Sequence, residues 1–489
     1  MMHCLIDSFP YCVSLMTIYD TVGCNFRPFE SGNGQHYSGN YWWANARYIN
    51  KLPIDYLKNK YDPEFWLLQK EPLFFNIHTI EHMYEQEYPL INYQESVKEG
   101  FLNNILFCKV GFPRTGLCNQ LYCITNVICI AASQVGDKII ILDDFINDIH
   151  TLNVTPTPFV LDLEKVNHFL SIFNIKCVYK NNIELTVNKI EYGLKHVKIL
   201  DITENIMKHF WKEKHLFIPK GVSLNDYTDC DPCPQMRKQI YVTYTINDVQ
   251  FEKTFHERNI VHFNPLEIKH SNYDGKPVGY VDSLDKPWLT RINRDDSKDL
   301  KPLFDIFLKQ LHFHSSFYGH AEEFINTIIP DREDVTINVI HLRNEQDAIS
   351  HWAKLNNLSE NEYRRLYETK LIETVHQYFQ KTDKTIFLTS FVDNNPVIEQ
   401  LREEGYECFV KENNEKLGRE MNGIVDLLIG QYCNQYFIGN LDTHTWQGST
   451  FSFVLYNQLK DTNVSSIFID IDHIDRDVVK ISENDIVTL

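Results

Sequence analysis

The residues with the clearest chemical potential stand at the start of a predicted helix near the C-terminus. A short apolar run at 436–438 is followed by a polar stretch, and Gly448-Ser449-Thr450 then precedes an apolar pattern that begins at Phe451. This order predicts a strand, a loop and a helix capped by Ser449. A helix start with small residues offers unpaired backbone N–H groups and the positive end of its dipole, which can hold a phosphate. An ordinary capped turn has the same pattern.

A second group of reactive side chains follows a predicted strand at 335–341. It comprises His341, Arg343, Glu345 and Asp347. A guanidinium at a strand end can grip a diphosphate with two hydrogen bonds and stays charged at any working pH. The alternatives are that Arg343 forms an ion pair with Glu345 or Asp347, and that His341 is a buried histidine with satisfied hydrogen bonds.

Composition limits the classes of function. The chain has 489 residues, 43% of them hydrophobic, which suits two or three domains with real cores. Its formal net charge of -19 argues against nucleic acid or an anionic membrane as partner, because both require a basic face. The 12 cysteines are too sparse for a disulfide scaffold. Cys230-Asp-Pro-Cys233 has no second cysteine pair, so a turn is favoured over a zinc or redox site.

The elements that must position these residues follow an alternating α/β pattern from residue 105 onward. Strands are predicted at 105–110, 138–142, 159–161, 177–179, 197–200 and 240–245, with a helix at 117–135. The second half predicts strands at 335–341, 385–388, 407–410 and 436–438, and helices at 363–380, 395–404 and 423–431. Right-handed crossovers would make this half a parallel, doubly wound sheet with its ligand at the carboxyl ends of the strands.

Two stretches bear on the location of the protein. The N-terminus lacks a basic start and a long apolar core, so no secretory signal is evident and a cytoplasmic protein is expected. Residues 115–136 carry no charge, which raises the question of a membrane span. Asn119, Gln120, Asn126 and Gln134 interrupt this stretch, and a buried helix is favoured.

Three motifs, in this order and at these separations, resemble those of the fucosyltransferase superfamily that includes the protein O-fucosyltransferases and their plant relatives. The first is Gly116-Leu-Cys-Asn119-Gln120, with Cys118 where many members have glycine. The second is His341-Leu-Arg343, which together with Glu345 and Asp347 is most similar to the plant branch. The third combines Phe437-Ile-Gly-Asn440 with Ser449-Thr-Phe-Ser452, and Asp426 lies on the preceding helix. The resemblance covers about residues 102–460.

The resemblance implies a GT-B fold, in which two Rossmann-like doubly wound domains face a cleft that holds a GDP-sugar donor without a catalytic metal. The domains would comprise residues 101–325, on the acceptor side, and 326–489, on the nucleotide-sugar side, after an N-terminal appendage at 1–100. The implied donor-binding residues are His341, Arg343, Asp426, Ser449, Thr450, Phe451, Thr389 and Ser390. Among them, Arg343 and the amides of 449–451 would hold the diphosphate. Thr389, Ser390 and Asp393 would read the base, although surface polarity explains them equally well.

The implied reaction moves fucose or a related deoxysugar to a hydroxyl group of a glycan or protein, with inversion. No cofactor is expected apart from the GDP-sugar co-substrate. The implied catalytic residues are Arg343, Glu345 and Asn119. Asn119 would lie near the sugar or the β-phosphate, where an uncharged amide can orient the leaving group; a helix-start hydrogen bond is its alternative role. Glu345, or less favourably Asp347, would be the general base, and a plain ion-pair role for Glu345 stays open.

Residues 36–66 are rich in aromatic side chains and resemble the closing segment of small polysaccharide-type glycosyltransferases of bacteria and large viruses. The segment is a remnant domain, an acceptor-side appendage or a packing element. If the source is a virus, the protein would be expected in the host cytoplasm.

Three other functions stay open. They are a non-catalytic nucleotide-sugar or glycan binder, a transferase that uses UDP- or dTDP-sugars such as a rhamnose donor, and a metal-dependent transferase built on the first hundred residues.

Overall fold

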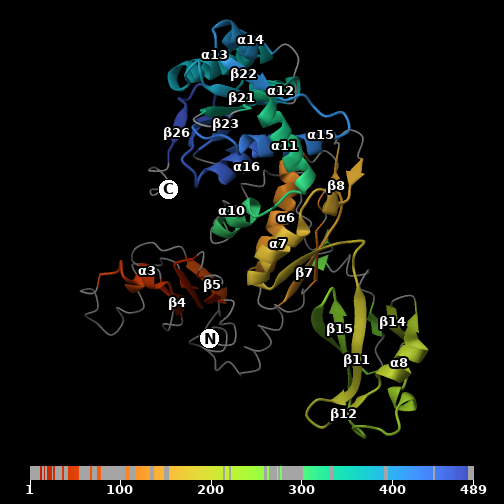
Figure 1. Ribbon diagram of the computed structural model, residues 1–489. Helices are drawn as coiled ribbons and strands as arrows, with labels where there is room; N and C mark the ends of the chain where they lie inside the picture. Colours follow the sequence, from red (N-terminus) through yellow and green to blue (C-terminus); the bar gives the residue numbers. More distant parts are fainter. Residues whose placement is uncertain are drawn as a thin grey trace.

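The alternating apolar segments fold into an α/β protein, as the computed structural model shows (Figure 1). The structure describes residues 12–13, 16, 19–24, 26–27, 36–37, 42–53, 66–68, 74–78, 105–108, 110, 116–132, 137–147, 153–212, 215–219, 222–257, 261–263, 272–273, 276–277, 301–330, 335–389, 395–443 and 447–482. Ser390 and Asp393, both predicted to read the base, lie outside these residues.

The largest sheet lies in the second half of the chain and has the strand order β22-β21-β20-β23-β25-β26. Its strands are β20 (Ile337–His341), β21 (Lys384–Leu388), β22 (Glu407–Val410), β23 (Tyr436–Asp442), β25 (Ser465–Ile469) and β26 (Val479–Ile481). Neighbours in this order pair in parallel except β26, which is antiparallel to β25. A seventh, two-residue strand, β24 (Gln447–Gly448), pairs antiparallel with β23. The chain order reverses between β20 and β23, and sheets of this kind bind ligands at such a switch point.

Helices cover both faces of this sheet because successive strand residues point to opposite sides. Ile340 packs in a core with α12 (Gln346–Leu355), α13 (Glu360–Tyr378) and α14 (Pro396–Glu403). Its neighbour Val339 belongs to the core that includes α15 (Arg419–Gly430) and α16 (Thr450–Leu459). The doubly wound arrangement predicted for residues 326–489 is therefore present.

The first half contains a smaller parallel sheet with the order β10-β7-β6. It is formed by β6 (Ile105–Cys108), β7 (Lys138–Leu142) and β10 (Ile175–Tyr179), and it is connected by α6 (Leu117–Ala132) and α7 (Leu163–Leu170). Ile140 and Leu142 of β7 pack on the side of these helices, whereas Ile139 and Ile141 belong to a different core on the other side. Both faces of β7 are thus buried.

An antiparallel lobe covers the second face of this small sheet. Its main sheet, β12-β11-β15-β16, consists of β11 (Leu185–Leu194), β12 (Lys198–Asp201), β15 (Gln239–Ile246) and β16 (Val249–His256), with α8 (Thr203–Phe210) beside it. Ile190 and Val242 of the lobe share a core with Ile139 and Ile141. The prediction of a doubly wound sheet throughout 101–325 is therefore wrong for residues 185–256, although the strands predicted at 197–200 and 240–245 are present as β12 and β15.

Shorter strands complete the described part of the first half. One pair consists of β8 (Phe145–Ile146) and β9 (Val154–Thr155), and another of β18 (Asn272–Tyr273) and β19 (Lys276–Pro277). A separate three-stranded sheet consists of β13 (Trp211–Lys212), β14 (His215–Ile218) and β17 (Val261–Phe263). The strand predicted at 159–161 is wrong. Thr157–Phe159 forms a 3₁₀ turn followed by a single bridge from Leu161 to Phe313, and Pro158 has no N–H for a ladder.

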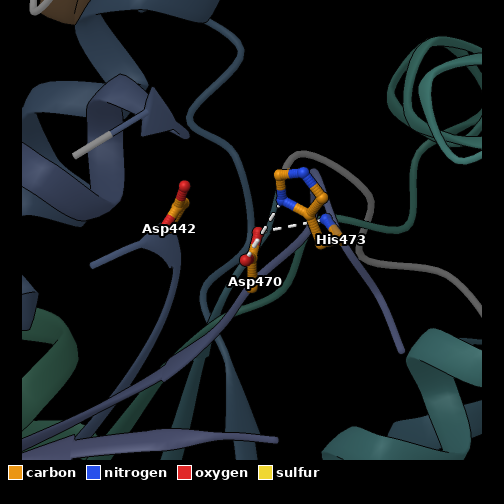
Figure 2. A group of neighbouring side chains, drawn as sticks. All are labelled: Asp442, Asp470 and His473. Atoms are coloured by element: carbon orange, nitrogen blue, oxygen red, sulfur yellow. Dashed lines mark hydrogen bonds and ion pairs between the residues drawn. The ribbon is translucent and has the colours of Figure 1, made fainter. Parts of the chain in front are cut away.

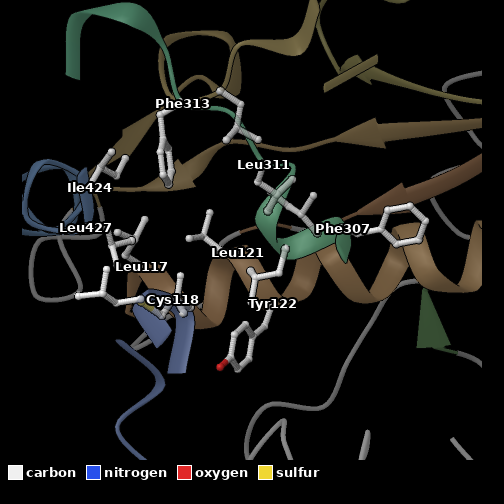
Figure 3. Close-up of a cluster of buried hydrophobic side chains, with 14 of the residues drawn as sticks. Leu117, Cys118, Leu121, Tyr122, Phe307, Leu311, Phe313, Ile424 and Leu427 are labelled. Carbon is white, nitrogen blue, oxygen red and sulfur yellow. The ribbon is translucent and has the colours of Figure 1, made fainter. Parts of the chain in front are cut away.

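Residues 117–132 of the uncharged stretch form α6, which is buried on nearly all sides. Leu121 and Tyr122 pack among side chains of α10 (Lys301–Lys309) and α15, including Phe307 and Ile424 (Figure 3). This agrees with the buried helix favoured from the sequence. Among the described residues, no helix has the length and apolar character that a membrane crossing requires.

One continuous core joins the two halves of the chain. It includes Tyr122 of α6, Phe304 of α10, Ile325 of α11 (Ser315–Ile328) and Phe453 of α16. Tyr122 packs edge-on against both Phe304 and Phe453, at ring distances of 5.3 and 6.0 Å. The division into domains near residue 325 stays a prediction, because this core does not break at that boundary.

The described parts of the first hundred residues form a small sheet, β4-β1-β5, from β1 (Thr21–Cys24), β4 (Trp42–Ala44) and β5 (Phe74–His78). The pair β2 (Phe26–Arg27) and β3 (His36–Tyr37) and the short helix α3 (Ala46–Ile49) accompany it. Several aromatic residues have packing roles, since Tyr48 Oη donates to Leu67 O at 2.6 Å and Trp66 Nε1 donates to Pro53 O at 2.9 Å. These contacts favour the packing alternative for the segment at 36–66.

Two glycine positions test how closely the first and second halves of the chain pack against each other. A Cβ at Gly418, before α15, would lie 2.0 Å from Asn147 Oδ1 and 2.7 Å from the Asn147 carbonyl oxygen, whereas a Cβ at Gly319 of α11 would meet nothing within 4 Å. We expect Gly418→Ala to destabilise the protein by about 1–3 kcal/mol through overpacking. Gly319→Ala is the control and should stabilise by up to about 1 kcal/mol, since alanine favours helix. Urea denaturation measures both, and equal effects would contradict the tight fit.

Candidate active site

A cleft of about 1090 Å³ lies at the switch point between β20 and β23. It receives side chains from the start of α6 in the first half and from β20, α12, α15 and α16 in the second. The predicted site residues that line it are Asn119, His341, Arg343, Glu345, Asp347, Thr389, Asp426, Ser449, Thr450 and Phe451. The structure thus brings together every predicted site residue that it describes, and their roles stay predictions.

The start of α16 has the conformation that its sequence predicts. Ser449 is the N-cap and its side chain accepts from the backbone N–H of Ser452. Gly448 has φ +120°, and a Cβ there would lie 2.8 Å from Asn440 O, so the position requires glycine. The N–H of Ser449 donates to Asn440 O at 2.9 Å. This corrects the expected phosphate cradle: only Thr450 and Phe451 offer first-turn amides without an intrahelical partner.

His341, at the end of β20, is buried against this helix. Its Nδ1 lies 2.7 Å from Ser452 Oγ, and its ring packs on Phe451 at a centroid distance of 4.6 Å. Ser452 Oγ also accepts from the N–H of Asn440, so its own proton is available to His341 Nδ1. Burial, and then the Arg343 charge, hold the pKa of His341 well below its ordinary value. His341 is therefore a neutral histidine that joins β20 to α16. This agrees with the alternative in which His341 is a buried histidine with satisfied hydrogen bonds.

Arg343 combines a fixed backbone with a partly engaged guanidinium. Its N–H donates to Tyr367 Oη at 3.1 Å, its Nη1 lies 3.1 Å from Glu345 Oε1, and its Cζ stands 5.3 Å from the centre of the Trp352 ring. Its Nε is buried and has no hydrogen-bond partner among the residues that the structure describes. A guanidinium with a spare buried donor is suited to accept a further anionic ligand.

The two acidic residues near Arg343 occupy different environments. Glu345 is 4% exposed and forms the ion pair with Arg343, so the ion-pair alternative describes its state in this structure. Asp347 is exposed in the first turn of α12, where its charge is favourable to the helix dipole. A base role for Glu345 requires an acceptor hydroxyl within hydrogen-bond distance of its carboxylate.

The other wall of the cleft is the first turn of α6. Asn119 Oδ1 is buried there and has no hydrogen-bond partner among described residues. The preceding residue, Cys118, is buried, and its pKa is raised by that burial and by the nearby Glu420 carboxylate. Glu420 accepts from the N–H of Leu117 at 2.5 Å. The sequence prediction missed Glu420 because it began α15 at residue 423, four residues too late.

Asp426 lies deeper in the cleft, on α15. Its Oδ1 is 3.3 Å from Lys411 Nζ, a buried ammonium that the sequence prediction also missed. Burial raises the pKa of Asp426 to about 6, and the Lys411 charge opposes this rise without cancelling it. A carboxyl group that titrates near neutral pH therefore lines the predicted donor site, together with the buried Thr389.

One further group of acidic and histidine side chains lies outside the residues that line the cleft. Asp442, Asp470 and His473 have ligand atoms within 4.8 Å of one another, and Figure 2 shows the ion pair between Asp470 and His473. The guanidinium of Arg476 lies 3.1 Å from Asp470 Oδ2 and 3.8 Å from Asp442 Oδ1. Arg476 thus supplies a positive charge to both carboxylates, as a metal ion would.

The raised pKa of Asp426 predicts a pH-dependent stability. The unfolded carboxyl titrates near 3.8 and the folded one near 6, so the folded state holds the extra proton between these values. Stability from this group is fully present below the lower pKa and is lost as the pH rises through the upper one. Between pH 4 and pH 8, the free energy of unfolding of the wild type should fall by on the order of 2 kcal/mol relative to that of Asp426→Asn, as measured by urea denaturation. A difference in the free energy of unfolding that is the same at both pH values would contradict the raised pKa of Asp426.

Comparison with known proteins gives distant matches. No protein-family model and no curated protein matches the chain. Among solved structures, POFUT1 in complex with GDP matches with a TM-score of 0.36 and 12% identity, over 74% of this chain and 97% of that one. The fucosyltransferase NodZ from Bradyrhizobium matches with a TM-score of 0.26 and 14% identity, over 37% of this chain and 53% of that one, so the match spans about half the length of NodZ. Both of these structures are fucosyltransferases.

Proposed function

We propose that the protein is a glycosyltransferase with a GT-B arrangement, which transfers fucose or a related deoxysugar from a GDP-sugar to a hydroxyl group. The observation that supports this most is the position of Arg343. Its guanidinium, with a spare buried Nε, lines the same cleft as the first-turn amides of α16, at the switch point of a parallel sheet. These are the donors that a diphosphate requires.

The reaction we propose inverts the anomeric carbon. The bond from that carbon to the diphosphate oxygen breaks as the acceptor oxygen attacks from the opposite side, and the acceptor proton passes to a base. Negative charge then grows on the leaving diphosphate. Arg343 and the amides of Thr450 and Phe451 stabilise this charge without a metal, and Asn119 orients the leaving group or the sugar from the opposite wall.

The charges around Arg343 fit a single anionic ligand. Glu345 already pairs with Nη1 of the guanidinium, which balances the charge of this partly buried arginine before the donor arrives. A diphosphate that takes over this guanidinium would free Glu345 to accept the acceptor proton. Binding of the donor and activation of the acceptor would then be coupled through one arginine.

The same ion pair favours a second candidate, a non-catalytic binder of nucleotide sugars. The Glu345 carboxylate is held in an ion pair with Arg343 at 3.1 Å and is not presented to an acceptor hydroxyl in this structure. In that case the cleft would hold a GDP-sugar without transferring it. Binding and turnover, measured separately, distinguish the two candidates.

Donor binding is tested first by thermal unfolding with GDP, UDP and dTDP. A nucleotide at about 100 times its Kd stabilises a folded protein by about 2.7 kcal/mol. We expect GDP to raise the Tm of wild type, with less effect from UDP and dTDP. Arg343→Ala should abolish the shift, while Arg365→Ala, an exposed arginine of α13, should retain it. A preserved GDP shift in Arg343→Ala would contradict the site.

Turnover is tested by release of GDP from GDP-fucose, with and without glycan acceptors. Loss of one group that stabilises transition-state charge typically costs about 10²–10³ in rate, so we expect this fall in kcat/KM for Arg343→Ala. Chelator should leave wild-type activity unchanged. Activity that vanishes with chelator would support a metal-dependent transferase instead, and GDP binding without any turnover would support the non-catalytic binder.

A further inference from the structure

The first turns of α6 and α15 meet at the wall of the cleft, and one buried carboxylate that lines the cleft joins them. Glu420 lies in the first turn of α15, is 6% exposed, and accepts at Oε2 from the N–H of Leu117, the first residue of α6. Since α6 has no acidic residue in its own first turn, Glu420 supplies the negative charge that its dipole favours. The carboxylate sits at the positive ends of two helices from opposite halves of the chain.

Two further contacts close a ring around this carboxylate. The backbone N–H of Glu420 donates to Asn147 O at 3.1 Å. The adjacent Ile146 exchanges both of its backbone groups with the side chain of Gln120, which donates to Ile146 O at 3.0 Å and accepts from Ile146 N–H at 2.8 Å. The path from Leu117 through Glu420, Asn147 and Ile146 therefore returns to α6 at Gln120, three residues further along.

Asn119 lies between the two points at which this ring holds α6. It lines the cleft, and its buried Oδ1 has no hydrogen-bond partner in the part of the chain that the structure describes. An amide that must meet a ligand from one wall of a cleft needs a fixed backbone, because a misplacement of about 1 Å can cost about 10² in rate. The ring supplies that fixed backbone to Asn119, which lines the same cleft as Arg343.

We propose that Glu420 is a positioning residue, which fixes the first turn of α6 and thereby holds Asn119 against the donor-binding half. This inference rests on the proposed function. Glu420 acts on the reaction through Asn119, whereas the affinity for GDP depends on Arg343 and the start of α16. Loss of the carboxylate should therefore lower kcat and leave GDP binding nearly unchanged.

Hydrogen exchange and kinetics of Glu420→Ala and Glu420→Gln test the inference. In Glu420→Ala, the amides of residues 117–120 should exchange about tenfold faster, as expected for loss of one hydrogen bond, and kcat should fall about tenfold. The Kd for GDP should change by less than about threefold. Glu420→Gln should recover most of both losses, because its amide oxygen can accept the same hydrogen bond.

The double variant Asn119→Ala, Glu420→Ala shows whether Glu420 acts through Asn119. Its kcat should equal that of Asn119→Ala alone, since residues that act as one unit are not additive. A further tenfold fall in the double variant would overturn the inference, and so would unchanged exchange of residues 117–120 in Glu420→Ala. Absence of turnover in wild type would count against the proposed function, whereas the exchange experiment would still decide whether Glu420 holds α6.

Discussion

The cleft depends on one buried asparagine at the end of β23. Asn440 uses all of its polar groups: its N–H donates to Ser452 Oγ at 2.9 Å, its carbonyl accepts from Ser449 N–H at 2.9 Å, its Nδ2 donates to His341 O at 2.6 Å, and its Oδ1 accepts from Tyr367 Oη at 2.9 Å. These bonds tie α16, β20 and α13 to β23. Because a buried polar group without a partner costs about 1–3 kcal/mol, the four bonds together specify one arrangement of the strand ends.

Tyr367 connects the hydrogen bonds of Asn440 to Arg343, the cation of the cleft. Its hydroxyl donates to Asn440 and accepts from the N–H of Arg343, so the same network fixes the backbone from which the guanidinium projects. Trp352 then supports the guanidinium, and its own Nε1 donates to Asp472 at 3.0 Å. In a chain with a net charge of -19, this local scaffold is what presents positive charge to an anionic ligand.

The sequence predicted four strands of the second half, because each is a short apolar run that ends in polar side chains, but it did not predict α12, β25 or β26. It did not predict the lobe at 185–256, since alternating strands are compatible with either parallel or antiparallel pairing until the partner is known. Glu420 was missed for a related reason: its partner, Leu117, is 303 residues away. The backbone use of the Ser449 N–H was equally hidden, because it follows from the glycine conformation at 448.

The core shared by α6, α10, α11, α15 and α16 has a consequence for how the chain can be divided. Met421, Val425 and Phe453 of the second half are covered by side chains of the first. A fragment that begins near residue 326 would expose this apolar surface to water, at about 25 cal/mol for each Å². Such a fragment would lose the cover of this surface, so the second half of the chain depends on the first and is not a separable module.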